Sequence, residues 1–428
     1  MTNSNEDRST GQTSFEPIDQ DEVEESDMLA AILVTLWRWT LAICDWRAHW
    51  RFLTGRPSID VAIITNVRDE QEKHLFWGNL KPRDGHSSGA RIYLNGVAGR
   101  VRGIYVTAAE LMTKSGRQLA KQQFINAVKW ADQRGAKVVL LAASTKRLFG
   151  RDGAELKAMF PHILFTIGDN GTSLLLCQDI AAALHKAKLG KNRRVLVIGP
   201  YGILGTEVTR FLLAQGYEVV GFGTNPNLLK EFASNFPIEL HSDITQVGKV
   251  DAVFACTHST EAKLTAERVE ILRHADKKLL VVDVAEPANL DIDDYQRCEH
   301  VVVRQDAGNA YSPELHFVLG KLSSSMLNLA PNSVFGCFAE SLTLYRAIYR
   351  DYQHTLLNQD WFDINRLNLA VLAHNFELNK VTPPPACCFG KPVRSFDLKR
   401  RSAPTPTFRK SKIMLLRDSL RHADQAKV

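Results

Sequence analysis

The chain has 428 residues, of which 45% are hydrophobic and 23% are charged, and its formal net charge is +6. Such a length can bury more than one hydrophobic core, and the composition excludes fibrous and wholly disordered proteins. The seven cysteines show no CxxC pair and no Cys/His spacing of a zinc site. We therefore expect a cytoplasmic protein with free thiols and no metal.

The N-terminal region divides into two segments. Residues 1–27 are rich in acids and poor in apolar residues, which predicts a disordered acidic tail. Residues 28–54 predict one amphipathic, Trp-rich helix, because apolar residues recur at spacings of three and four: Ile32, Leu36, Trp39, Ile43, Trp46, Trp50 and Leu53. Arg38 and Asp45 interrupt the run and argue against a spanning helix. The helix fits either a peripheral membrane contact or packing on its own domain or a second subunit.

Residues 58–188 predict a first αβ domain. Strands are expected at 61–65, 91–94, 104–106 and 137–142, and helices at 108–133 and 172–188. Residues 191–335 then repeat a strand, a turn and a helix, with strands at 194–198, 218–222, 252–256 and 278–282. This alternation indicates a parallel sheet. The predicted fold class is α/β, a Rossmann-like dinucleotide-binding domain with a parallel sheet plus a second αβ domain.

Two segments follow these domains. Residues 336–385 are expected to form closing helices, at 339–350 and 366–376, and residues 386–428 a basic flexible tail. The basic tail has no aromatic side chains arranged to stack on bases, so we expect no specific nucleic-acid partner.

A glycine-rich turn follows the strand at 194–198. Gly199, Gly202 and Gly205 have the spacing G-x-x-G-x-x-G and lead into an amphipathic helix, with Tyr201, Ile203 and Leu204 between them. Glycines here permit a tight turn and close approach of the backbone to a pyrophosphate, which the helix N-terminus attracts. The strand, turn and helix together predict a dinucleotide site.

The choice of cofactor is predicted from the end of the next strand. NAD sites place an acid there for the ribose 2′-hydroxyl, whereas this chain has Thr224 and Asn225. NADP(H) is therefore favoured over NAD(H). Thr257 and Asp283, at the ends of the two following strands, complete the predicted cofactor-binding residues.

Cys337 stands where the helix 339–350 is expected to begin. A helix N-terminus favours a thiolate, but Glu340 three residues on would oppose it. Spacing alone favours a buried core thiol over a nucleophile.

The chain nevertheless resembles a known family, the long-chain fatty acyl-[acyl-carrier-protein] reductases of cyanobacteria, which form fatty aldehydes from acyl thioesters with NADPH. The similarity runs from about residue 61 to about residue 388, through the segments at 103–106, 166–172, 199–205 and 281–291, and is most specific in the sequence CFAE at 337–340. The resemblance implies that Cys337 is a nucleophile that carries the acyl group, with Glu340 beside it, and that the substrate is a long-chain acyl thioester delivered by acyl carrier protein or coenzyme A.

Further residues are candidates for the same reaction. Ser144 and Thr145 could donate to an oxyanion, and His316 could be a general acid. Asn170 and Thr172 could face the substrate or cap the helix that begins there. The chain departs from the family in two places. After the second strand of the dinucleotide-binding domain, residues 224–227 replace a segment that contains an arginine in the family. The family's His-Ser pair falls near residues 313–314, where this chain has Pro-Glu, and the nearest histidine, His316, is shifted from that position. Two alternatives stay open: a dehydrogenase of the shikimate-dehydrogenase or glutamyl-tRNA-reductase type, and a non-catalytic NADP-binding, membrane-associated protein.

Overall fold

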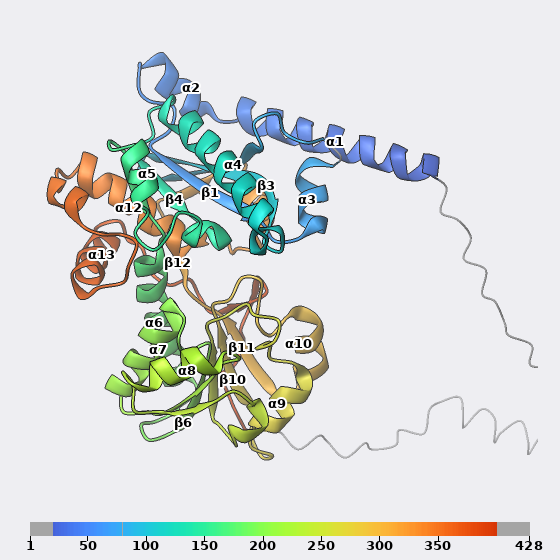
Figure 1. Cartoon of the computed structure of the whole chain (residues 1–428), viewed down its shortest axis with the longest axis vertical. Helices are drawn as coiled ribbons and strands as arrows, with labels where there is room; N and C mark the ends of the chain where they lie inside the picture. The colour runs from blue at the N-terminus through green and yellow to red at the C-terminus, as the bar shows by residue number, and fades with distance from the viewer. Residues whose placement is uncertain (1–19, 79, 400–428) are drawn as a thin grey trace, which may run out of the picture.

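The computed structural model describes residues 20–78 and 80–399, which form two αβ domains joined by the long helix α6 (Asp169–Lys186) (Figure 1). Each domain is built on its own six-stranded sheet. Within these residues, no helix combines the length and apolar character needed to cross a membrane.

The first sheet has a parallel centre and an antiparallel edge. β1, β3, β4 and β5 run parallel, whereas β2 and β13 are antiparallel to their neighbours. Side chains on neighbouring strand positions point to opposite faces, so Ile63 packs beneath α12 and Ile64 beneath α4. The strand order is β13 (Leu315–Phe317), β2 (His86–Leu94), β3 (Val97–Thr107), β1 (Val61–Val67), β4 (Val138–Leu141) and β5 (Leu164–Thr166), and the covering helices are α4 (Lys114–Asp132) and α12 (Gly336–Tyr349).

The second sheet is parallel throughout. Counted within the domain, its strands lie in the order 3-2-1-4-5-6, which confirms the predicted Rossmann-like domain and the fold class. The expected strands at 194–198 and 218–222 are confirmed to the residue. The strands are β8 (Glu239–His241), β7 (Glu218–Phe222), β6 (Arg194–Ile198), β9 (Ala252–Ala255), β10 (Leu279–Asp283) and β11 (Val302–Asp306), and the helices between them are α7 (Ile203–Ala214), α8 (Pro226–Ala233), α9 (Ala266–Leu272) and α10 (Ile292–Cys298).

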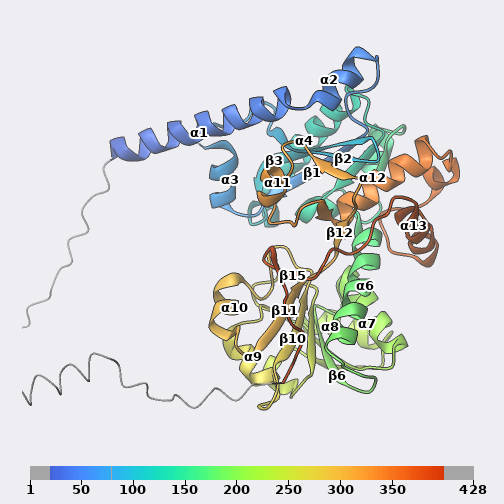
Figure 2. The ribbon, with the colours of Figure 1, turned by 180° about the vertical axis from the view of Figure 1, so that it is seen from behind.

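Helix α6 belongs to both domains. Leu175 near its start is buried in the core beneath α12, whereas Ile180 and Leu184 further along pack against the second sheet. Figure 2 shows this helix bridging the two bodies, with α13 (Arg366–Leu378) beside its upper half. Short helices that the sequence did not indicate fill other connections: α3 (Glu70–Trp77), α5 (Ala154–Met159) and α11 (Lys321–Ser325).

The predicted boundary of the second domain at residue 335 was wrong. β13 pairs with β2 of the first sheet, and β12 (Asn309–Tyr311) pairs with β14 (Ser333–Phe335), which leads into α12. The chain therefore returns to the first domain soon after β11. These strands have three residues each, too few for a periodic signal.

The single helix predicted at 28–54 was also wrong, because the segment forms α1 (Gln20–Ile43) and α2 (Trp46–Leu53). Asp45 separates them: its carboxylate accepts from the Ala48 N–H at 3.1 Å and pairs with Arg91 and Arg100 at 3.0 and 2.8 Å. Residues 20–27 are helical rather than disordered, and residues 1–19 of the predicted tail lie outside the described residues.

The first part of the predicted flexible tail, residues 386–399, is ordered. β15 (Cys387–Cys388) pairs with β16 (Lys391–Pro392), and both cysteines are buried. Further on, the Lys278 N–H donates to the Leu398 carbonyl at 2.7 Å. The segment 386–399 is thus ordered against the second domain, and residues 400–428 lie outside the described residues.

Candidate functional site

The turn between β6 and α7 accepts only glycine at two of its positions. Gly199 has φ +78°, and a Cβ there would lie 2.8 Å from the Thr257 Cβ at the end of β9. A Cβ on Gly205 would lie 2.0 Å from the Gly199 carbonyl oxygen. The N-terminus of α7 is thereby held at the carboxyl end of β6, at the point where the strand order reverses. Its first N–H groups, on Ile203, Leu204 and Gly205, have no helical acceptor and suit a pyrophosphate.

Tyr201 and Gly223 shape the end of β7, where the adenosine ribose binds in such domains. A Cβ on Gly223 would lie 2.4 Å from the Tyr201 ring, so the ring rests directly on this glycine. The Tyr201 hydroxyl accepts from the Asn225 N–H at 3.3 Å, and the Asn225 side chain caps α8. Thr224 is half-buried between them. This end of β7 therefore presents hydroxyl and amide groups and no carboxylate.

A cation lies close to the same strand. The guanidinium of Arg268, in α9, is 5.9 Å from the centroid of the Phe222 ring, at the last residue of β7. It also donates to the carbonyl oxygens of Glu261 and Lys263. The sequence gave no indication of Arg268, because it belongs to a helix more than forty residues beyond the strand it adjoins.

Asp283 holds a loop rather than facing a ligand. Its buried carboxylate pairs with Arg304 at 3.0 Å and accepts from the N–H groups of Ala285 and Leu290 at 3.0 and 3.1 Å. Both oxygens are engaged by protein groups. The structure therefore gives Asp283 the role of positioning the loop after β10, at the carboxyl edge of the sheet.

Cys337 lies where the N-termini of α6 and α12 meet. A Cβ on Gly168, which has φ +73°, would lie 2.2 Å from the Cys337 Cβ, and one on Gly171 would lie 2.8 Å from the Glu340 Cβ. A Cβ on Gly336 would lie 2.6 Å from the carbonyl oxygen of Gly308. These glycines allow the two helix ends to touch. The Cys337 side chain beside them is partly exposed.

Lys146 sets the charge around the thiol. Burial raises the pKa of Cys337 to about 11, and Lys146 opposes this rise while Asp169 and Glu340 add to it. Lys146 forms an ion pair with the buried Asp169. The sequence pointed to Ser144 and Thr145 but not to Lys146, because no spacing connects Lys146 to Cys337.

Glu340 is completely buried and connects the two helices. Its carboxylate accepts from the Thr166 hydroxyl and, at 2.6 Å, from the Gly171 N–H. Burial raises the pKa of Glu340 to about 7. Since both oxygens bind protein groups, Glu340 is a positioning residue that fixes α12 against α6.

The remaining residues predicted near the substrate have mainly structural contacts. The buried Thr145 hydroxyl donates to the Ala142 carbonyl at 2.7 Å, and the Ser144 N–H donates to Asn66 at 2.9 Å. The Asn170 side chain donates to the Asp363 carbonyl at 3.0 Å, while its buried Oδ1 has no partner among the described residues.

The expected capping role of Thr172 was wrong. Helix α6 begins at Asp169, with Gly168 as its N-cap, and Thr172 lies in its first turn. The Thr172 hydroxyl donates back to the Gly168 carbonyl at 3.0 Å. The sequence pattern placed the helix start late because the first turn contains glycine and polar residues.

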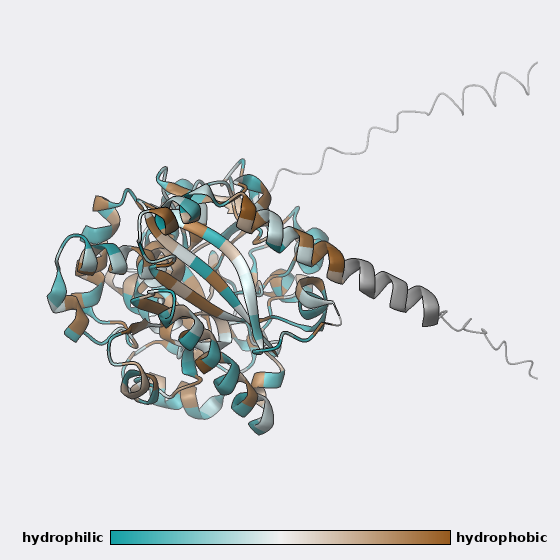
Figure 3. Ribbon diagram, turned by 90° about the horizontal axis from the view of Figure 1, so that it is seen from above, coloured by the Kyte–Doolittle hydropathy of each residue, from teal (hydrophilic) through white to brown (hydrophobic). Residues whose placement is uncertain are grey.

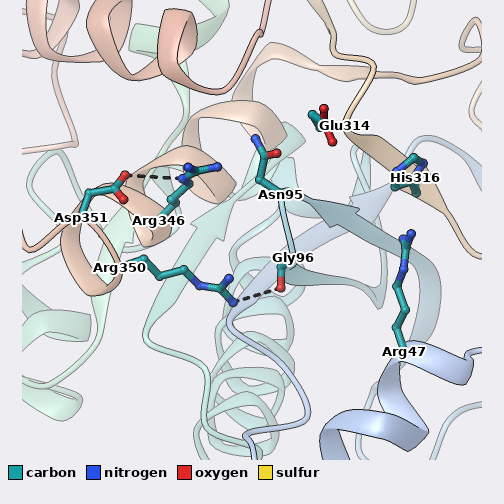
Figure 4. Close-up of a pocket in the computed structure, with 8 residues that line it drawn as sticks. All are labelled: Arg47, Asn95, Gly96, Glu314, His316, Arg346, Arg350 and Asp351. Atoms are coloured by element: carbon teal, nitrogen blue, oxygen red, sulfur yellow. Dashed lines mark hydrogen bonds and ion pairs between the residues drawn. The ribbon is translucent and has the colours of Figure 1, made fainter.

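His316 does not reach the thiol. It is an exposed residue of β13, at one edge of the first sheet, whereas Gly168 contacts Cys337 just beyond β5, at the other edge. Five strand spacings separate these edges, about 24 Å. Figure 4 shows His316 in a recess with Arg47 and Arg350 instead. The prediction that His316 is a general acid for Cys337 was therefore wrong.

Cys337 and the cofactor turn both lie at the carboxyl edge of the second sheet. Val284 follows β10, and a Cβ on Gly308 would lie 2.7 Å from its side chain. The Gly336 N–H donates to the Gly308 carbonyl at 2.9 Å, one residue before Cys337. An ion pair of 2.9 Å between Arg68 and Glu286 also links the two domains here. Gly308 and Val284 thus connect the carboxyl ends of β10 and β11 to the residue before Cys337.

Residues 181–305 match the family model of shikimate/quinate 5-dehydrogenase. With the strand order and the glycine turn, this match defines the class of the second domain, an NAD(P)-binding Rossmann domain of the dehydrogenase type. The match ends before Cys337 and includes none of the first sheet. No curated protein matches the sequence.

Among solved structures, L-tryptophan dehydrogenase from Nostoc punctiforme is 11% identical over 75% of this chain and 89% of its own, with a TM-score of 0.34. The nucleotide-binding domain of glutamyl-tRNA reductase from Thermoplasma volcanium is 19% identical over 30% of this chain and 84% of its own, with a TM-score of 0.23. CAD from Helicobacter pylori, complexed with NADP(H), is 16% identical over 32% of this chain and 38% of its own, with a TM-score of 0.24. The chain thus spans less than two fifths of that last protein.

Proposed function

We propose that the protein is an NAD(P)H-dependent oxidoreductase that reduces a long-chain acyl thioester to a fatty aldehyde through Cys337. The observation that carries this proposal is the position of the thiol: partly exposed, at the start of α12, beside Lys146 and at the cofactor edge of the second sheet. A purely structural cysteine does not need an adjacent cation or a helix N-terminus.

In the first step, the Cys337 sulfur forms a bond to the acyl carbonyl carbon, and the bond from that carbon to the carrier sulfur breaks. The thiol proton leaves with the carrier as its free thiol. Because the pKa of Cys337 is about 11, the thiol is protonated at neutral pH, and its thiolate must be stabilised. The Lys146 ammonium and the N-terminus of α12 supply the positive charge that does this.

In the second step, the acyl group on Cys337 is reduced and released as an aldehyde. The hydride would come from a nicotinamide held by the turn at Gly199–Gly205. The backbone N–H of Phe338 donates to the Cys337 sulfur. This N–H and the Lys146 ammonium are the groups that would stabilise the carbonyl oxygen as it becomes negative. Breaking the carbon–sulfur bond would then release the aldehyde and leave Cys337 as a thiolate, which takes up one proton from solvent to return to its starting state.

We propose NADP(H) as the preferred cofactor. The end of β7 presents Thr224 and Asn225 where a carboxylate would repel a 2′-phosphate, and Arg268 lies beside Phe222. The three N–H groups at the start of α7 would hold the pyrophosphate.

The test measures consumption of NADPH and NADH by the purified protein with palmitoyl and stearoyl thioesters of acyl carrier protein and of coenzyme A. Aldehyde is detected directly, and Cys337→Ala is compared with the parent protein. We expect aldehyde from the parent protein alone, with NADPH the better donor. Equal aldehyde from both proteins would remove Cys337 from the mechanism.

A second candidate function is a dehydrogenase acting on a different substrate, which the match of residues 181–305 favours. Such an enzyme would not depend on Cys337. It would oxidise or reduce small hydroxy, keto or amino acids, with equal rates for the parent protein and Cys337→Ala. Tight NADPH binding with no turnover of either substrate class would instead indicate a non-catalytic binding protein.

A further inference from the structure

The seven residues that define the apolar stripe of the N-terminal helices are all exposed: Ile32, Leu36, Trp39, Ile43, Trp46, Trp50 and Leu53. The least exposed of them, Ile32, retains 47% of its accessible surface. Figure 1 shows α1 running outward from the first domain, and in Figure 3 the coloured part of this helix carries brown, hydrophobic segments next to the body. An exposed apolar surface of this extent, carried on two consecutive helices, is typical of an interaction site.

The stripe faces outward because the other side of α1 is bound to the first domain. Leu41 is buried against Tyr93 and Ala98. The Arg38 guanidinium donates to the Phe76 carbonyl at 2.7 Å and to the Ser87 hydroxyl at 2.9 Å. The direction in which the stripe points is therefore fixed by contacts on the opposite face of the helix.

The acids of α1 all precede the stripe, at Asp21, Glu22, Glu24, Glu25 and Asp27. Asp45 is the one carboxylate in residues 28–58, and it is buried in its ion pairs with Arg91 and Arg100. Arg47 lies 5.3 Å from the ring centroids of Trp46 and Tyr93 and has no carboxylate partner among the described residues. Arg56, just after α2, is also exposed. The stripe thus combines tryptophan and arginine with unpaired positive charge.

A basic recess adjoins α2 at Arg47. This cavity of 470 Å³ is also lined by Arg346 and Arg350, against the carboxylates of Glu314 and Asp351 (Figure 4). Arg346 pairs with Asp351 at 3.5 Å, and Arg350 donates to the Gly96 carbonyl at 3.0 Å. Arg346 and Arg350 are thus paired with carboxylates, Asp351 and Asp60, whereas Arg47 has no such partner among the described residues.

A second copy of the chain fits the stripe poorly. A helix–helix seam needs one continuous stripe with charged residues beside it to set the register. Here the helix is interrupted at Asp45, and none of the exposed residues between those of the stripe is an acid, a lysine or an arginine: they are Leu33, Thr35, Thr40, Cys44, His49 and Phe52. Tryptophan next to arginine is instead the composition of helices that lie in the interfacial layer of a bilayer. We propose that α1 and α2 dock the protein onto a lipid surface that contains anionic headgroups.

The test is co-sedimentation of the full chain with vesicles of phosphatidylcholine alone and of phosphatidylcholine with phosphatidylglycerol. The parent protein is compared with the triple variant Trp39→Ser, Trp46→Ser and Trp50→Ser. The matched control replaces three exposed apolar residues elsewhere, Ile271→Ser, Leu367→Ser and Leu378→Ser. Thermal unfolding followed by circular dichroism establishes that all three proteins are folded.

We expect the parent protein and the control to bind the anionic vesicles, and the triple variant to bind roughly tenfold less or weaker still. Binding should weaken on vesicles of phosphatidylcholine alone and at raised salt, because headgroup charge contributes. Two results would overturn the proposal. In the first, the parent protein binds neither kind of vesicle and forms a dimer, and the triple variant does not dimerise. In the second, the parent protein and the triple variant bind the vesicles equally.

Discussion

The cofactor turn and the thiol site are both built on glycines that allow contacts closer than a Cβ permits. In the turn, Gly199 and Gly205 belong to one run of seven residues that covers the connection after β6 and the first residues of α7. At the thiol, Gly168 and Gly171 are at the start of α6, whereas Gly308 and Gly336 come more than a hundred residues later in the sequence. The close glycine contacts are thus local in sequence at the turn, whereas at the thiol they form only when distant segments fold together.

This difference decides what each site depends on. The turn needs only its own strand and helix, so it should survive changes in the first domain. The thiol site needs α6 and α12 to be packed together, so it should be sensitive to changes on either helix. Substitutions that damage one site and leave the other intact therefore test the comparison.

The largest effect is expected from Gly205→Ala. The new Cβ would lie 2.0 Å from the Gly199 carbonyl oxygen, so the turn must open and the N–H groups of α7 must move. Loss of two charge-assisted hydrogen bonds should weaken NADPH binding by about 100-fold, measured by calorimetry. Gly190→Ala is the matched control, because a Cβ there meets nothing within 4 Å. Unchanged NADPH affinity in Gly205→Ala would contradict the assigned turn.

Gly168→Ala should act on the other site alone. The Cβ would lie 2.2 Å from the Cys337 Cβ, at a residue with φ +73°. A displacement of about 1 Å at a reacting group can cost about 100-fold in rate. We expect aldehyde formation to fall by about this factor while NADPH affinity stays at the parental value. A parallel loss of cofactor binding would show that the two sites are not independent.

Lys146 should contribute less than the cysteine it assists. Lys146→Met removes the ammonium that opposes the rise in the pKa of Cys337, so the thiol should titrate at still higher pH. Alkylation of Cys337 by iodoacetamide should therefore slow by roughly tenfold at neutral pH, with a pH profile shifted upward. Lys146→Arg, which keeps the charge, should retain most of the rate. If Lys146→Met leaves the profile unchanged, Lys146 has no role at the thiol.

Glu340 should affect the pH dependence of stability. Its pKa is raised from an ordinary value of 4.5 to about 7 in the folded protein, so the folded state binds the proton more tightly than the unfolded chain. Its stabilising contribution is therefore complete below about pH 4.5 and is lost as the pH rises to about 7. The expected loss is about 3 kcal/mol over this window.

Glu340→Gln provides the comparison, because the amide mimics the protonated side chain. Urea unfolding between pH 5 and pH 8 should show a smaller decline in the free energy of unfolding for Glu340→Gln than for the parent protein. Identical declines would place the pKa of Glu340 outside this range.

The sequence predicted elements that depend on neighbouring residues, but not contacts between residues that are distant in the sequence. The strands at 194–198 and 218–222 were predicted to the residue because continuous apolar runs are bounded by glycine and charged residues. The three-residue strands β12, β13 and β14 gave no pattern, so the return of the chain to the first domain was missed. Lys146, Asp169 and Arg268 acquire their neighbours only in the folded chain.

The N-terminal helix shows the same limit. Its apolar stripe was predicted from spacing, but the break at Asp45 was not, because the residues that hold this carboxylate, Arg91 and Arg100, are on β2 and β3. A helical pattern can be predicted from the spacing of apolar residues alone. A buried ion pair cannot, because its partners come close only in the folded chain.

The most direct test of the central claim is intact-mass measurement of the protein after incubation with a palmitoyl thioester in the absence of reduced cofactor. We predict that one palmitoyl group is added to the parent protein, that peptide mapping places it on Cys337, and that NADPH then releases it as aldehyde. Cys337→Ala should stay unmodified. Aldehyde formation without acylation of Cys337, or acylation that NADPH does not discharge, would contradict the account.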